Sequence, residues 1–172
     1  MQESGKAIWL ATCAVLADAG GKRFLVDGMI GEKGHPFSVL PKEAETALME
    51  GRAPYADIDY LMFTHLHPDH FDCDLTIEFL QRHPVRGVLL PLEESNETMR
   101  KGGIRLRRYM IQSGIPYRLL RLPIGQNIRY RLDGFEVTAF NTGHMGEAYA
   151  AVNNYCYLLQ TGGTSVLFTG FS

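Results

Sequence analysis

The chain has 172 residues, a formal net charge of −2, 45% apolar residues and 21% charged residues. This length suits one domain with its own core, and the composition is that of an ordinary globular protein. The small net charge argues against a general binder of polyanions.

The first elements are predicted from an apolar run between Ala7 and Ala17, followed by a turn at Gly20-Gly21. We interpret the run as one buried strand. The alternative is a secretory signal peptide, which is less favoured because Glu3 offsets the charge of Lys6. No apolar run reaches the length of a membrane span.

Strands and helices alternate after this run, and short strands dominate the last third of the chain. Asp133-Gly134 and Gly162-Gly163 are typical hairpin turns. In chain order the sequence predicts strands over 7–17 and 23–27, a loop over 28–37, a helix from Pro41 to Gly51, a strand over 58–64, a helix over 75–82, a strand over 85–90, a helix over 93–114 broken at Gly102-Gly103, and strands over 117–122, 127–131, 135–141, 152–159 and 165–169. This alternation predicts a layered α/β fold.

Cysteine usage points to a reducing compartment. The three cysteines, Cys13, Cys73 and Cys156, are odd in number and form no CxxC pair. Such a pattern is not a disulfide framework, so we expect a cytoplasmic protein.

Basic residues are concentrated between Arg100 and Arg131, where nine of the 17 lie without any Asp or Glu. One interpretation is a solvated surface that is balanced by acids elsewhere in the fold. The other is a surface that attracts an anionic substrate or nucleic acid.

The strongest chemical signal is the segment Thr64-His65-Leu66-His67-Pro68-Asp69-His70, which directly follows a predicted strand. His65 and His67 are two residues apart, so they point the same way in extended backbone. Two imidazoles on one side suit a metal ion such as zinc. By contrast, His35 and His83 lie beside prolines in predicted loops, and we expect them at the surface.

These motifs resemble the metallo-β-lactamase superfamily of metal-dependent hydrolases. The pattern HxHxDH over 65–70, after an apolar strand, is the signature of that superfamily. Asp27 resembles its first motif, His144 in Asn141-Thr142-Gly143-His144 its third, and 166–170 the strand before its fourth. The continuation Phe71-Asp72 is similar to the subgroup that contains the ascorbate-phosphate lactonase.

The resemblance implies a fold and a set of metal ligands. The fold would be α/β, with metallo-β-lactamase-like layers of sheet and helix. The first metal would be held by His65, His67 and His144, and the second by Asp69 and His70, while Asp27 supports the metal loop from outside. Zinc is the expected ion, one or two per chain, with iron and manganese left open.

The sequence departs from the family pattern at its end. The family has a metal-bridging aspartate after the Thr-Gly pair, where this sequence has Phe171, and a final histidine ligand from a second half of the fold. We therefore expect one domain over 1–172 that holds the first half to two-thirds of the fold, truncated at the C-terminus. The second metal site should be weak or empty.

The implied activity is hydrolysis of an ester, lactone or phosphoester, with Asp69 as the catalytic residue that orients a water molecule or accepts its proton. The small-molecule substrate would be anionic if the basic segment contributes to binding. The alternatives are an inactive metal-binding domain and a nucleic-acid-processing member of the superfamily. An open sheet face would favour a homodimer.

Overall fold

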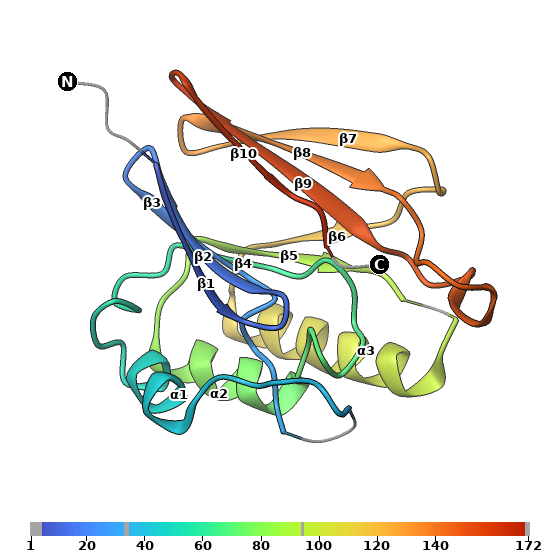
Figure 1. Ribbon diagram of the computed structural model, residues 1–172, viewed down its shortest axis with the longest axis horizontal. Helices are drawn as coiled ribbons and strands as arrows, with labels where there is room; N and C mark the ends of the chain where they lie inside the picture. Colours follow the sequence, from blue (N-terminus) through green and yellow to red (C-terminus); the bar gives the residue numbers. More distant parts are fainter. Residues whose placement is uncertain (1–4, 33–34, 94, 171–172) are drawn as a thin grey trace.

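Two β-sheets pack face to face, and three helices cover the outer face of the larger sheet (Figure 1). The computed structural model describes residues 5–32, 35–93 and 95–170. The elements are β1 (Lys6–Ala11), β2 (Ala14–Ala19), β3 (Lys22–Val26), α1 (Lys42–Met49), β4 (Tyr60–Met62), α2 (Cys73–Arg82), β5 (Gly87–Pro91), α3 (Glu97–Ser113), β6 (Tyr117–Leu120), β7 (Asn127–Leu132), β8 (Phe135–Asn141), the 3₁₀ turn η1 (Glu147–Tyr149), β9 (Tyr155–Thr161) and β10 (Thr164–Phe168).

The larger sheet has six strands in the order β1-β2-β3-β4-β5-β6. The first three strands are antiparallel, whereas β3 to β6 run parallel. Every residue of β4 and β5 is buried, as expected for parallel strands that are covered on both faces. Because β3, β4 and β5 run parallel, their C-terminal ends lie side by side at the same end of the sheet. The histidine segment begins there, directly after β4.

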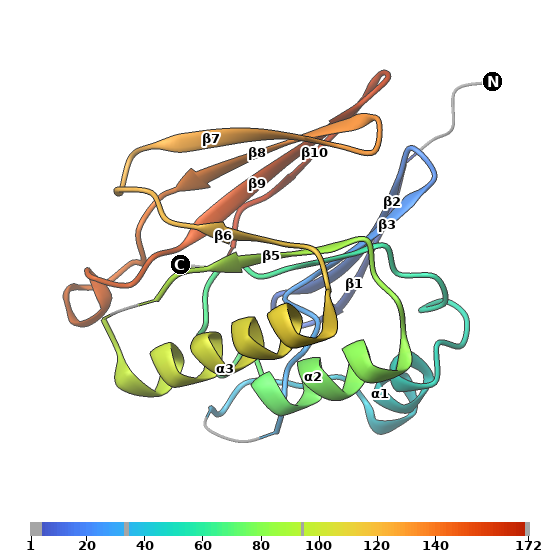
Figure 2. The ribbon, with the colours of Figure 1, turned by 180° about the vertical axis from the view of Figure 1, so that it is seen from behind.

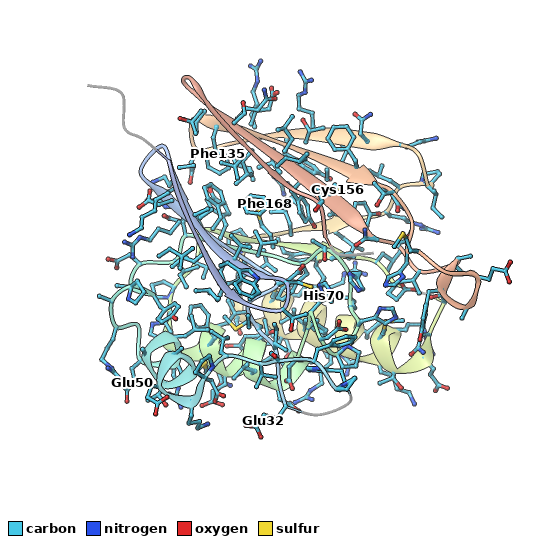
Figure 3. The ribbon with its side chains drawn as sticks, in the orientation of Figure 1. Glu32, Glu50, His70, Phe135, Cys156 and Phe168 are labelled. Atoms are coloured by element: carbon cyan, nitrogen blue, oxygen red, sulfur yellow. The ribbon has the colours of Figure 1, made fainter. Side chains whose placement is uncertain are left out.

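The smaller sheet is antiparallel, with the order β10-β9-β8-β7. Its hairpins turn at Asp133-Gly134 and Gly162-Gly163, as predicted. Its inner face contributes Val137, Tyr157 and Phe168 to an apolar layer that also contains Phe24 of β3. Figure 3 shows Phe135 and Phe168 in this layer between the two sheets.

The helices form a second apolar layer on the opposite face of the larger sheet (Figure 2). Phe79 of α2 and Leu106 of α3 are buried against residues such as Leu61 and Leu90 of the parallel strands. The molecule therefore has the order helices, six-stranded sheet, four-stranded sheet. None of the helices in the described ranges has the length and apolar character that crossing a bilayer requires.

Two predicted elements differ from the structure. The predicted single strand 7–17 is a hairpin of β1 and β2, with Thr12 and Cys13 in its turn. This expectation was wrong because the turn consists of Thr12 and Cys13 and contains none of the Gly, Pro, Asn or Asp residues that mark most turns in a sequence. The predicted break at Gly102-Gly103 was also wrong, since α3 is continuous.

The two glycines permit a close approach of α3 to the histidine segment. A Cβ atom on Gly103 would lie 2.9 Å from Leu66 Cδ1, and one on Gly102 would lie 3.2 Å from Phe71 Cε1. The two glycines therefore allow α3 to pack closely against Leu66 and Phe71. This packing offsets the weak helix propensity of glycine.

Candidate metal centre

Three histidines from two sheets meet at the end of β4. His65 and His67 follow β4, and His144 follows β8 of the other sheet. Each offers one ring nitrogen, and these nitrogens all lie within 4.8 Å of one another. The ring centroids are 4.8 to 5.0 Å apart. The spacing suits one ion held between three imidazoles.

A second group of possible ligands shares His65. Ligand atoms of His65, Asp69 and His70 also lie within 4.8 Å of one another. His70 Nε2 is 3.5 Å from Asp69 Oδ2. The structure thus brings together all five residues predicted as metal ligands, and their role as ligands stays a prediction.

Asp27 organises this loop from behind. It follows β3 with a φ of 48°, a left-handed conformation that aspartate adopts more readily than most residues. Its carboxylate accepts hydrogen bonds from the Thr64 backbone N–H (2.8 Å), the Thr64 hydroxyl (2.6 Å) and His70 Nδ1 (2.9 Å). All three residues are at most 1% exposed. Asp27 therefore holds the loop that carries the histidines, and its role in supporting a bound metal stays a prediction.

The hydrogen bonds determine which ring nitrogens face the centre. His70 Nδ1–H donates to Asp27, and the Thr64 hydroxyl gives its proton to the same carboxylate. The Thr64 oxygen then accepts from His65 Nδ1–H at 3.1 Å, and His144 Nδ1–H donates to the Met145 carbonyl at 2.8 Å. These three rings keep Nε2 for a metal ion, with the opposite nitrogen anchored as metal-binding histidines usually are.

Burial and mutual repulsion affect the charges of the rings. Burial, followed by the neighbouring histidines, lowers the pKa of His65, and burial with His144 lowers that of His67. Both rings are therefore neutral at pH 7, the state that a metal ligand requires. Burial also lowers the pKa of His70, but Asp27 and then Cys13 raise it more, to about 10. A metal ion at His70 must therefore displace a proton.

The centre opens into a cavity of about 590 Å³. His67, Asp69, His70 and His144 line it together with residues that the sequence did not single out: Thr12, Cys13, Pro36, Phe37, Pro68, Asn96 and Tyr149. His35, expected at the surface, is half-buried and also lines the cavity. The Tyr149 ring lies 5.1 Å from His67 and 5.2 Å from His144, measured between centroids.

None of the nine basic residues between Arg100 and Arg131 is among the described residues that line this cavity. Several of them form ion pairs outside it, such as Arg105 with Asp74 and Arg129 with Glu136. The expectation about Phe171 concerns a position outside the described residues.

The layered α/β fold is shared with solved metal-dependent hydrolases, which confirms the predicted fold class. Comparison with protein-family models and with curated protein sequences finds no match.

Solved structures do match this chain. It is similar to the diiron β-hydroxylase CmlA from Streptomyces venezuelae, with 22% identity, a TM-score of 0.57, and coverage of 98% of this chain and 30% of CmlA. A possible metal-dependent hydrolase from Veillonella parvula matches with 15% identity, a TM-score of 0.59, and coverage of 95% and 62%. The metallo hydrolase Igni18 from Ignicoccus hospitalis matches with 15% identity, a TM-score of 0.55, and coverage of 95% and 59%.

At these identities the likeness is one of fold. The chain spans 30% of the length of CmlA and about 60% of the lengths of the two hydrolases.

Proposed function

We propose that this chain is a metal-dependent hydrolase that acts with water on an ester, lactone or phosphoester. The observation that carries the proposal is the convergence of His65, His67 and His144 beside Asp69 in an open cavity. The fold, which is shared with metallo-hydrolases, supports it.

The residues fit a catalytic metal ion. Three imidazole ligands leave one position of a tetrahedral ion open, as in catalytic zinc sites. When bound, such an ion supplies a water with a pKa near 7 and polarises the oxygen under attack. Zinc is the first candidate. Iron is the second, because CmlA is a diiron enzyme and imidazole suits both metals.

Asp69 is the proposed catalytic residue. It lies in the turn after His67, lines the cavity, and its side chain is 17% exposed. A carboxylate there can orient a water molecule and accept its proton. Tyr149 and Phe37 border the same cavity and would contact the body of the substrate. The basic segment does not line the cavity, so it would increase the affinity for an anionic substrate through long-range electrostatic attraction.

A second candidate is a metal-binding domain without hydrolytic activity. The observation that favours it is Phe171, which stands where the superfamily has its bridging aspartate and has no metal-binding atom. This candidate shares the three-histidine site with the first and differs only in turnover.

Metal content tests the site. We expect about one metal ion or more per chain in protein purified without chelator, because the three-histidine site is complete. His65→Ala should lose this metal, whereas His83→Ala, which lies beside Phe79 and Met49 away from the cavity, should keep it. Absence of metal from the wild-type protein would contradict both candidates.

Turnover then separates the candidates. Neutral and phosphorylated esters and lactones should be hydrolysed by the wild-type protein and not by His65→Ala. A metal-loaded protein that turns over none of them would favour the inactive domain. A preference for the phosphorylated substrate that fades with added salt would support the contribution of the basic segment.

A further inference from the structure

The three-histidine group draws its ligands from both sheets. His65 and His67 follow β4 of the larger sheet, whereas His144 follows β8 of the smaller one. The distance between them therefore depends on how the ends of the two sheets are held together. The His144 backbone N–H donates to the Val152 carbonyl at 3.2 Å, so the segment that enters β9 holds the loop after β8. A contact that fixes this segment to the larger sheet also fixes His144.

Glu93, just after β5, is a buried carboxylate that provides such a contact. The residue is 3% exposed, and an ionised carboxylate is costly to bury unless donors surround it. Its Oε1 accepts from the Ser95 backbone N–H at 2.6 Å and from the Ser95 hydroxyl at 2.5 Å. Its Oε2 accepts from the Asn153 backbone N–H at 3.2 Å. Glu93 therefore joins the end of β5 to the residue that directly follows Val152.

Two asparagine side chains continue this connection to the histidine loop. Asn153 Nδ2 donates to the Leu92 carbonyl at 2.9 Å, which is a second attachment to the larger sheet. Asn141 Nδ2 donates to Asn153 Oδ1 at 2.7 Å. Asn141 Oδ1 accepts from the Gly143 N–H at 3.0 Å. Because Gly143 directly precedes His144, hydrogen bonds hold the backbone on both sides of the third histidine.

We propose that Glu93 is a positioning residue that holds His144 at the distance where three imidazoles bind one metal ion. The proposal rests on the metal site of the proposed function and deepens it. Asp27 holds the loop of the two ligands on the larger sheet, whereas Glu93 acts on the third ligand from across the gap between the sheets. Glu93 is not among the described residues that line the cavity, so it acts through His144 and not on the substrate.

Glu93→Gln tests the proposal at unchanged size. Glutamine has one acceptor oxygen in place of two, so its NH2 group must face either the Ser95 donors or the Asn153 N–H. Metal-free protein is titrated with cobalt(II), whose visible spectrum depends on its ligands. We expect the affinity for the first cobalt ion to fall about 10-fold or more, as for other outer partners of metal ligands. The spectrum at saturation should also change, because water replaces the displaced imidazole.

The spectrum separates positioning from general stabilisation. A purely structural role of Glu93 would lower the free energy of unfolding and leave the spectrum of the cobalt-saturated protein unchanged. Glu97→Gln is the matched control, since Glu97 lies in the first turn of α3 and pairs with Lys101 while its side chain is 68% exposed. This variant should match the wild-type protein in both cobalt affinity and spectrum.

A double-mutant cycle shows whether Glu93 acts through His144. His144→Ala should bind cobalt more weakly than the wild-type protein. Addition of Glu93→Gln to this variant should change the affinity by less than about twofold, because the ligand that Glu93 positions is gone. Asn153→Ala keeps Glu93 and breaks the side-chain link to Asn141. It should likewise weaken cobalt binding in the wild-type background and not in His144→Ala.

The outcomes distinguish this proposal from the one on which it rests. A wild-type protein that binds no cobalt would overturn both. If the wild-type protein binds cobalt and Glu93→Gln has the same affinity and spectrum, the three-histidine site stands and the role of Glu93 is overturned. An equal loss of affinity with and without His144 would also overturn it. Circular dichroism of the metal-free variants should match the wild-type protein, and Asn153→Ala provides the same test if Glu93→Gln does not fold.

Discussion

At the scale of single residues, the loop after β4 depends on one buried carboxylate. Asp27 joins the end of β3 to the loop after β4, because it accepts from both the backbone and the hydroxyl of Thr64. It also anchors His70 through Nδ1. A single side chain therefore sets the position of the loop and the nitrogen that His70 presents.

Replacement of Asp27 by Asn tests this arrangement. Asparagine tolerates the same left-handed backbone, so the main loss is the negative charge beside His70. We expect metal affinity to fall about 10- to 100-fold, as for other supporting partners of metal-binding histidines. The metal-free protein should lose about 3 kcal/mol of unfolding free energy near neutral pH, because a buried pair is broken.

The pH dependence of that loss follows from the raised pKa of His70. Below pH about 6.5 the ring is protonated in both folded and unfolded chains, so the stabilisation by Asp27 is fully present. It disappears as the pH rises through about 10, where the folded ring loses its proton. Urea unfolding of metal-free wild type and Asp27→Asn should therefore show a smaller difference at pH 10.5 than at pH 6. An unchanged difference would contradict the ion pair.

The clustering of four of the five candidate ligands was predictable because their spacing is local, whereas His144 was identified only through the family resemblance. His65, His67, Asp69 and His70 lie within six positions after an apolar strand, so the sequence alone brings them together. Cys13 could not be found in this way. It lines the cavity only because β1 and β2 form a hairpin whose turn lies there, and the sequence pattern did not reveal that hairpin.

At the scale of elements, α3 supports the histidine loop through a close contact. Leu66 lies between His65 and His67 and is buried against Gly103. The residues Phe71 and Asp72, which resembled a subgroup motif, also have structural roles. Phe71 packs on Phe63 with centroids 5.1 Å apart, and Asp72 caps α2 by accepting from the Leu75 N–H at 2.9 Å.

Gly103→Val should test the contact between α3 and the loop. The new side chain must displace Leu66, and overpacking of this kind costs about 1–3 kcal/mol. Because valine has the better helix propensity, the helix itself is not weakened. We expect a lower unfolding temperature and weaker metal binding. Arg108→Val, at an exposed position of the same helix, should change neither. Unaltered metal affinity in Gly103→Val would show that Leu66 moves aside without disturbing the histidines.

Most of the element order was predictable, since hairpin glycines and apolar runs are local signals. The path of β1 and β2 and the continuity of α3 were not, because both depend on contacts between distant segments. Gly102 and Gly103 weaken an isolated helix, and only the position of Leu66 and Phe71 explains their presence.

At the scale of the whole molecule, the four-stranded sheet has one face without a covering layer in the described part of the chain (Figure 1). Leu158 and Leu167 are paired across neighbouring strands on this face; Leu158 is half-buried and Leu167 is 58% exposed. Arg129 and Glu136 form an ion pair farther along the same face. The two leucines are the apolar part of this face and the part that a covering surface would remove from water.

We expect the open face of the four-stranded sheet to pack against the same face of a second copy of the chain. Sedimentation of the wild-type protein should show a dimer, because pairing these sheet faces removes the leucine side chains from water. Leu158→Glu should shift the equilibrium to the monomer by placing a charge at the centre of the contact. Gln160→Glu, two residues along the same strand face and beside Ser165, places the same charge at the polar margin and should shift it less. A wild-type protein that sediments as a stable monomer would contradict the dimer.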